Sequence, residues 1–501
     1  MSSIHEQAMS YVYQQVLQRL LGFLDRAERT ALQLLIQRLI VAAGGIERIG
    51  HFTVLIAFSG GKDSAYTLAF LRAAQLSIAG RSPHTFKLRV ANMRHAGMTA
   101  AVMDNIHRCY SALFMHDDPR VELLVVDHQY VQPFERDLPF STAGREQNRS
   151  DMLLSGHLTA GDGRTTFCNS CYLGMAEFLG RAACWGEGVD AVLNGDSLRE
   201  QKHYATWIMR LAQRTGQPIF DWKRQTFNGA LKTIDNVSRA YYRELYGEDV
   251  QPPGFMARPL GYPNKAITPT LVSVADLVDS RAHDHWAMLT DFLGFRFDDL
   301  AFSFTESDCA NPMLMAHMHG LKAEYVQGRD YAQGIAEYLE LAKTLMRRKR
   351  LPRRLIDLAM AAYDDPEKLA VRRTLAADYA QEAFGLSEAQ LVCLLFAPFV
   401  DGGARLEPFL RRWHPGMLVA LTDLHKALSA RAAPEQVVQW LVEISGLSLK
   451  GLQNLYRKQR VDFNDDQSII AHVRASDPDK RQILTLDPET DHGLGDLISR
   501  R

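Results

Sequence analysis

The chain has little cysteine, no long apolar run and no excess of charge of either sign. Six cysteines in 501 residues are too few for a disulfide framework, so a cysteine cluster is better explained by metal binding or catalysis. The absence of any stretch of about 18 uninterrupted apolar residues excludes a recognisable transmembrane helix. With 57 basic and 58 acidic residues, the chain needs a local basic patch if it is to bind nucleic acid.

The first six residues, Met1–Glu6, lack the basic and apolar regions of a signal peptide. We therefore expect a cytoplasmic protein with no membrane partner. The sequence also lacks internal repeats and low-complexity segments. Its 47% hydrophobic and 23% charged residues are typical of globular proteins.

Hydrophobic patterning divides the chain into three regions. Residues 1–48 show helical spacing, which predicts an N-terminal helical region with two helices that meet near Asp25. Residues 49–325 alternate short β-branched runs with helical stretches, which predicts an α/β domain with a parallel sheet and helices on both faces. Residues 326–501 predict an all-α C-terminal domain. The runs expected to form strands are Phe52–Phe58, Phe86–Met93, Val121–Val126 and Val189–Leu193.

A glycine loop follows the first expected strand and precedes an amphipathic run, Ala65–Gln75. Its two glycines allow the backbone to approach phosphate oxygens, and the following helix would present unpaired N–H groups and a partial positive charge. Lys62 adds an ammonium group, while Asp63 suits Mg²⁺ or a capping role. The alternative is a simple capped helix start, and the spacing is not that of a Walker A loop. The loop residues are Ser59, Gly60, Gly61, Lys62, Asp63 and Ser64.

The hexapeptide SGGKDS after an apolar strand resembles the signature of the PP-loop ATP pyrophosphatases, a group similar in fold to the adenine nucleotide α-hydrolases. The resemblance implies that ATP is cleaved between its α- and β-phosphates while the loop holds the departing pyrophosphate. A substrate oxygen attacks the α-phosphorus, and a nucleophile then displaces AMP. The resemblance also implies Mg²⁺, which neutralises the leaving group, and adenine contacts near Val90–Met93.

Cys168 and Cys171 form a C-x-x-C motif ahead of a helical run, Tyr172–Trp185. At the start of a helix both sulfurs lie on one side, and the helix dipole favours thiolate. The residues alone leave four interpretations open: a redox dithiol, half of a zinc site that Cys184 and His203 could complete, part of an iron–sulfur cluster, or an incidental pair.

The order of the motifs is similar to that of the PP-loop tRNA thiolases, such as the 2-thiocytidine and 2-thiouridine synthetases. After the C-x-x-C motif come a strand end with Asn194, Gly195 and Asp196, then Arg258-Pro259-Leu260, then a lone Cys309. The resemblance implies that Asn194, Gly195 and Asp196 lie at the ATP site. It also implies a [4Fe–4S] cluster with one iron open to carry sulfur, and zinc is the weaker alternative. The implied ligands are Cys168, Cys171 and Cys309.

We therefore expect Mg·ATP-dependent adenylation of a carbonyl oxygen, followed by sulfur transfer from a sulfur donor to a tRNA base or a small heterocycle. Lys62, Asp63 and Asp196 are the expected catalytic residues. The main alternative is an AMP-forming ligase that delivers ammonia or an amine, as the sugar amidotransferases do. A regulatory nucleotide-binding protein is disfavoured because the pyrophosphate-stabilising residues of the loop are intact.

Three further features carry weaker predictions. The basic run Lys343–Arg354 contains seven basic residues and could follow an RNA backbone, or it could be the solvated end of a helix. Asp127-His128 ends an expected strand, where parallel sheets place ligand contacts. Cys109 and Cys393 lie in apolar helical contexts and are expected to be core residues.

Overall fold

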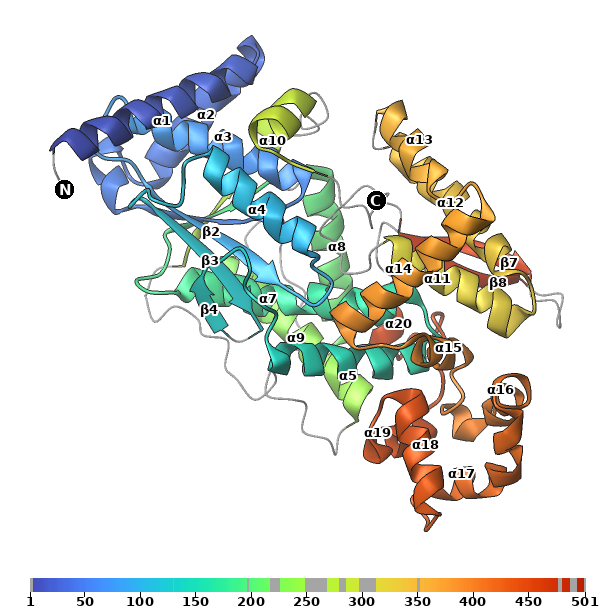
Figure 1. Cartoon of the computed structure of the whole chain (residues 1–501). Coiled ribbons are helices and arrows are strands. Elements are labelled where there is room, and N and C mark those ends of the chain that lie inside the picture. The colour runs from blue at the N-terminus through green and yellow to red at the C-terminus, as the bar shows by residue number, and fades with distance from the viewer. Residues whose placement is uncertain are drawn as a thin grey trace.

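The computed structural model contains a six-stranded, mostly parallel sheet followed by a largely helical C-terminal region (Figure 1). It describes residues 3–128, 130–195, 198–216, 226–247, 268–278, 285–296, 312–348, 352–475, 480–486 and 493–499. In this part of the chain, every helix is too short or too polar to cross a lipid bilayer.

The strands of the sheet are arranged in the order β4-β3-β2-β1-β5-β6. All neighbouring pairs are parallel except β3 and β4. The four predicted strands are confirmed, while β4 and β6 were not predicted. The strands are β1 (Thr53–Ala57), β2 (Lys87–Arg94), β3 (Val121–Asp127), β4 (Tyr130–Pro133), β5 (Ala191–Asn194) and β6 (Thr270–Ser273).

The N-terminal region forms the two predicted helices, α1 (Ser3–Phe23) and α2 (Arg26–Ala42). Asp25 separates them because its carboxylate caps α2, accepting a hydrogen bond from the Glu28 N–H at 2.7 Å. The Glu28 side chain accepts from the Asp25 N–H in return, which completes a capping box. Both helices pack against α3 and share its hydrophobic core.

Helices cover both faces of the sheet (Figure 1). Because side chains alternate along a strand, Val54 and Ile56 of β1 join one core with α1–α4, whereas Leu55 joins another with α7 and α9. The helices of this part are α3 (Lys62–Ala79), α4 (Ala100–Ala112), α5 (Thr142–Leu158), α6 (Gly163–Phe167), α7 (Asn169–Cys184), α8 (Leu198–Arg214), α9 (Phe227–Tyr246) and α10 (Ala275–Val278).

The C-terminal region is helical but not all-α, because the chain ends in an antiparallel pair, β7 (Lys480–Leu486) and β8 (Gly493–Ser499). One large core joins α5, α6, α8 and α9 to the helices of this region, so it extends across the boundary predicted at residue 325. The helices are α11 (Pro312–Leu321), α12 (Tyr331–Arg348), α13 (Arg353–Ala361), α14 (Pro366–Phe384), α15 (Glu388–Phe396), α16 (Leu406–Trp413), α17 (Leu421–Leu428), α18 (Glu435–Ser445), α19 (Leu449–Tyr456) and α20 (Ile469–Ala475). Shorter 3-10 or π turns span Ile46–His51, Met288–Phe292, Lys322–Gln327, Asp401–Gly403 and Pro415–Ala420.

Candidate nucleotide loop and adjoining pocket

The loop Ser59–Ser64 leaves the carboxyl end of β1, near the middle of the sheet. The chain passes from β1 to β2 and β3 on one side and returns to β5 on the other. β1 and β5 are therefore the strands at which the order reverses. In open α/β sheets this reversal point forms a crevice where ligands bind. The structure therefore contains the predicted strand, loop and helix, and the loop lies at this reversal point.

The loop backbone passes close to the neighbouring helix α4. Gly60 has a φ of +79°, and a Cβ atom there would lie 2.8 Å from Ile106 Cγ1. Glycine is therefore required for both conformation and space. Gly61 caps α3 without a side-chain hydrogen bond, so the first turn of α3 remains available to an anion.

Lys62 and Asp63 form an ion pair at the start of α3. The Lys62 side chain is only 1% exposed, and its Nζ lies 2.7 and 2.8 Å from the two carboxylate oxygens of Asp63. The Asp63 side chain is 63% exposed. A phosphate could replace this carboxylate as the partner of Lys62, and the accessible carboxylate has the oxygen chemistry that Mg²⁺ prefers.

The two serines of the loop form hydrogen bonds within it. Ser64 Oγ donates to the Gly61 carbonyl oxygen at 2.9 Å and lies 2.9 Å from Ser59 Oγ. Ser59 Oγ also accepts from the Gly61 N–H at 3.3 Å. These bonds fix the turn between β1 and α3.

The end of β5 lies beside the first turns of α3. A Cβ atom on Gly195 would lie 2.9 Å from Thr67 Cγ2, and Thr67 Oγ1 donates to the Asp63 carbonyl oxygen at 3.0 Å. The structure therefore brings Asn194 and Gly195 close to the loop Ser59–Ser64. Asp196 and the segment Arg258–Leu260 lie outside the described residues.

The C-x-x-C motif lies at the start of α7, as predicted. Cys168 is the N-cap residue and is 3% exposed, while Cys171 lies in the first turn. The side chain of Cys171 and the whole of Cys309 lie outside the described part of the structure. The convergence of the three cysteines therefore stays a prediction.

Cys184 cannot complete a zinc site with the C-x-x-C motif, so this alternative is wrong. It ends α7, which spans 16 residues, or about 24 Å at a rise of about 1.5 Å per residue. Zinc ligands lie about 2.3 Å from the metal. Burial also raises the pKa of the Cys184 thiol to about 11. Among the described side chains, no three His, Cys, Asp or Glu residues are grouped to hold a metal.

α11 packs against α6, the short helix directly before Cys168. A Cβ atom on Gly163 of α6 would overlap Met315 Cε of α11. A buried ion pair holds the same end of α6: Arg474 Nε lies 2.8 Å from Asp162 Oδ1, and Asp162 caps α6. Contacts with α11 and with Arg474 therefore hold α6, the helix directly before Cys168.

Cys109 and Cys393 are buried core residues, as predicted. Each lies within one of the large hydrophobic cores and is at most 2% exposed. Burial raises the pKa of both thiols. Neither has the environment of a reactive thiolate.

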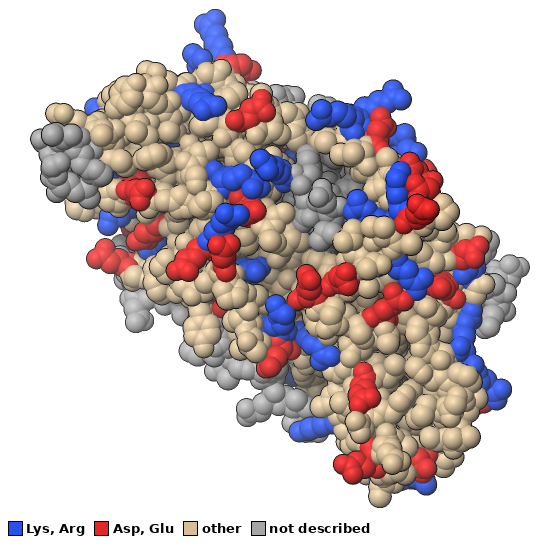
Figure 2. Space-filling view, viewed as in Figure 1, with Lys and Arg blue, Asp and Glu red and all other residues tan. Residues whose placement is uncertain are grey.

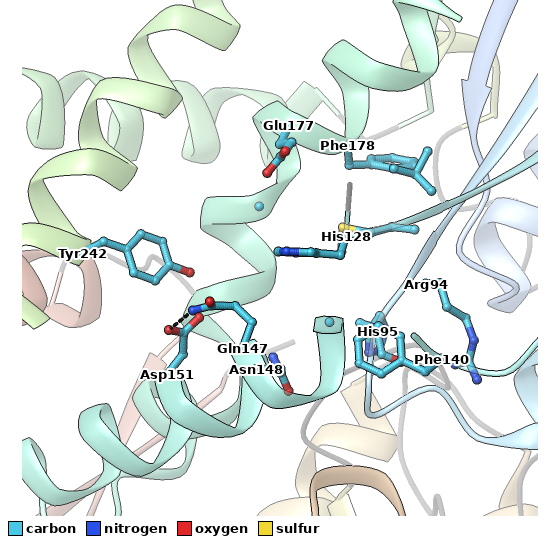
Figure 3. Close-up of a pocket in the computed structure, with 14 residues that line it drawn as sticks. Arg94, His95, His128, Phe140, Gln147, Asn148, Asp151, Glu177, Phe178 and Tyr242 are labelled. Carbon is cyan, nitrogen blue, oxygen red and sulfur yellow. Dashed lines mark hydrogen bonds between the residues drawn. The ribbon is translucent and has the colours of Figure 1, made fainter. Parts of the chain in front are cut away.

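A pocket opens at the carboxyl ends of β2 and β3, between α5, α7 and α9 (Figure 3). Its volume is about 110 Å³. Figure 3 shows polar side chains directed toward its interior from several elements. The sequence analysis identified only His128 among them. The polar lining includes His128, Gln147, Asn148, Asp151, Glu177 and Tyr242.

Asp151 is a nearly buried carboxyl group in the pocket wall. Its Oδ1 accepts hydrogen bonds from Gln147 Nε2 at 2.8 Å and from the Tyr246 hydroxyl at 2.5 Å. Burial raises the pKa of Asp151 from 3.8 to about 7, although hydrogen bonds from Tyr246, Gln147 and Tyr242 oppose the shift. A carboxyl group with this pKa can accept or donate a proton near neutral pH.

The two residues at the predicted strand end differ in role: Asp127 is structural, while His128 lines the pocket. Asp127 is buried and accepts hydrogen bonds from the Ser141 N–H and hydroxyl, both at 2.8 Å. His128 has a φ of +51°, an unusual conformation for a residue with a side chain, and its ring enters the pocket (Figure 3). The strained turn therefore directs an imidazole toward the pocket interior.

The basic run falls at the predicted helix end. α12 ends at Arg348, and α13 begins after Pro352. Figure 2 shows basic side chains on the projecting end formed by these helices, with charges of both signs over the rest of this face. Arg353 is 94% exposed and lies 3.7 Å from Asp357. Residues 349–351 are outside the described ranges, and RNA contact stays a prediction.

Comparisons with protein-family models, with curated proteins and with solved structures gave no match. The fold and loop define a protein with a mostly parallel α/β sheet and a glycine loop at a central strand. Its function is therefore inferred from the chemistry of its own residues.

Proposed function

We propose that the protein is an Mg·ATP-dependent enzyme that adenylates a carbonyl oxygen and releases pyrophosphate, with AMP released in a second step. The observation that carries this proposal is the uncapped start of α3 after Gly60 and Gly61, with the Lys62 ammonium beside it. A helix N-terminus and a lysine stabilise negative charge that develops on a leaving pyrophosphate. The resemblance to the PP-loop ATP pyrophosphatases supports cleavage of ATP between its α- and β-phosphates.

The residues of the loop suit the cofactor. The glycines leave room for phosphate oxygens, Lys62 supplies positive charge, and the exposed carboxylate of Asp63 can ligate Mg²⁺. Asn194 and Gly195 border the same crevice. Asp196 remains a proposed catalytic residue because of its place in the motif order.

For the second step we favour sulfur as the nucleophile. A [4Fe–4S] cluster held by Cys168, Cys171 and Cys309 would supply an exchangeable position for sulfur. The position of two of these cysteines supports this ligand set, because Cys168 is the N-cap of α7 and Cys171 lies in its first turn. The acceptor would be a tRNA base or a small heterocycle.

An AMP-forming amide ligase is the second candidate, and Asp151 favours it. An ammonium group must lose one proton to become a nucleophile, and the attacking nitrogen loses a second as the amide forms and AMP leaves. A carboxylate with a pKa of about 7 is a suitable general base for these transfers. The iron content separates the candidates. Protein purified without oxygen should contain about four irons per chain if sulfur is delivered from the cluster, and Cys168→Ser should lose them while Cys393→Ser should not. A protein without iron would favour the ligase.

Pyrophosphate release tests the adenylation step itself. Lys62→Ala should lower turnover by about 100-fold or more, because a missing charge partner in the transition state commonly costs about 3 kcal/mol or more. Lys87→Ala is the matched control, since Lys87 is exposed at the opposite end of the sheet. Full activity in Lys62→Ala would exclude the proposed role of the loop.

A further inference from the structure

The pocket beside α5 and α7 has a chemical character distinct from that of the phosphate-binding loop. Its polar wall presents the carboxyl groups of Asp151 and Glu177, the Tyr242 hydroxyl and the His128 ring, which converge in Figure 3. Arg94 lies at another end of the pocket, where its Nη1 donates to the carbonyl oxygens of His95 and Met98, both at 3.2 Å. The wall formed by α5, α7 and α9 is therefore acidic.

Asp151 is held by uncharged groups. The described side chains that hydrogen-bond to it are Gln147, Tyr246 and Tyr242. A buried carboxylate without a cationic partner is costly. A positively charged group bound in the pocket would provide the missing countercharge.

Glu177 is positioned over the same space. Its Oε1 accepts from Arg181 Nε at 2.9 Å and from Nη2 at 2.6 Å, one helical turn further along α7. The side chain is 13% exposed. Arg181 thus fixes the carboxylate at the pocket wall but neutralises part of its charge.

The remaining lining is aromatic and limits the size of a ligand. Phe140, Phe178 and Tyr242 contribute flat surfaces. The volume of about 110 Å³ is close to the roughly 150 Å³ of a cavity that binds benzene, so the pocket suits a ligand of about one ring. Since no three of the described His, Cys, Asp or Glu side chains are grouped to hold a metal ion, an organic ligand fits this pocket better than a metal ion.

We propose that this pocket binds a small planar molecule that presents a protonated nitrogen, or paired N–H donors, to Asp151 and Glu177. The role of this molecule as the second substrate of the enzyme rests on the proposed function, whereas its binding does not. β2 and β3 end at the same sheet edge as β1. The pocket at their ends therefore lies about one to two strand spacings, or about 5–10 Å, from the loop Ser59–Ser64.

Binding of such a cation should strengthen as the pH rises through about 7, because Asp151 then becomes ionised. The other titratable groups that face or adjoin it are Glu177 on α7, Tyr242 and Tyr246 on α9, and His95 and His128 at the strand ends.

The test uses three ring compounds of similar size with the full chain: benzamidine as the cation, benzamide as the neutral analogue and benzoate as the anion. Calorimetry should detect benzamidine binding, weaker benzamide binding and no benzoate binding. Asp151→Asn and Glu177→Gln should each weaken benzamidine binding by about tenfold, the value of one charge-assisted hydrogen bond. Glu187→Gln, an exposed site just beyond α7, should leave it unchanged.

Three results would overturn the proposal: benzoate binding as tight as benzamidine, unchanged benzamidine binding in both pocket variants, or displacement of benzamidine by excess Mg·ATP. The last would assign the pocket to the nucleotide. Glu177→Gln keeps the test decisive if Asp151→Asn does not fold. Benzamidine binding without AMP formation would refute the proposed function and leave the pocket assignment intact, while the reverse result would refute only the pocket.

Discussion

Asp151 lies in an environment that its sequence context does not suggest. It lies in an amphipathic helix, α5, and no motif surrounds it. Its burial depends on Tyr242 and Tyr246, which are more than 90 residues away. By contrast, the loop residues Gly60 and Lys62 could be predicted because one short segment contains both the strand end and the helix start.

The raised pKa of Asp151 makes a prediction about stability. In the unfolded chain the carboxyl group ionises near pH 4, whereas in the folded protein it stays protonated up to about pH 7. This group therefore lowers stability as the pH rises between those values, by up to about 4 kcal/mol. Asp151→Asn cannot ionise, so relative to wild type it should gain stability as the pH rises from about 5 to about 8.

Urea unfolding of both proteins across this pH range measures the difference. Asp117→Asn, at an exposed site, serves as the control and should show no such trend. A free-energy difference between Asp151→Asn and wild type that stays constant with pH would contradict the assigned burial.

At the scale of elements, the long and strongly patterned segments were predictable. The apolar strands β1, β2, β3 and β5 and the helix boundary at Asp25 agree with the prediction because local pattern and capping specify them. β4 and β6 have four residues each and owe their structure to pairing with longer strands. The β7–β8 pair was missed for a different reason: the chain after about residue 462 is polar, so its strands were not expected.

The short helix α6 depends on a distant partner, which gives a second prediction. Arg474 is fully buried and pairs with Asp162, the N-cap of α6. Arg474→Met should lower the free energy of unfolding by about 3–5 kcal/mol, because it removes the buried cation that pairs with the Asp162 carboxylate. It should also expose Cys168 to thiol reagents. Denaturant unfolding and the rate of thiol labelling provide the two measurements.

Arg411→Met is the matched control for that experiment. Arg411 forms an exposed i,i+4 pair with Glu407, and such pairs contribute little to stability. Equal effects of Arg411→Met and Arg474→Met would show that the α6 contact is unimportant.

At the scale of the whole molecule, charge decides between the possible acceptors. The net charge of −1 gives no general attraction to RNA, so a tRNA acceptor requires the exposed basic residues at the α12–α13 end. If they contact tRNA, reversing Arg347, Arg353 and Arg354 should reduce the slope of log affinity against log salt by about three. Filter binding at several salt concentrations measures this slope.

Reversal of Arg26, Arg81 and Lys87, which are exposed in the N-terminal half, is the control for charge alone. Undetectable tRNA binding, or an unchanged slope, would assign the acceptor to the small molecules.

The regional division of the chain was predictable from patterning, but the shared core of α5, α6 and the C-terminal helices was not. Periodicity identifies a buried helix face without identifying the helix that covers it.

The central claim is that the loop Ser59–Ser64 directs cleavage of ATP between the α- and β-phosphates. The most direct measurement is the identity of the nucleotide products after the full chain is incubated with Mg²⁺, ATP and the small-molecule fraction or tRNA of a cell extract. We predict AMP and pyrophosphate in equal amounts, with the yield of both lowered by about 100-fold or more in Lys62→Ala. Formation of ADP and orthophosphate by the wild-type protein would contradict the account.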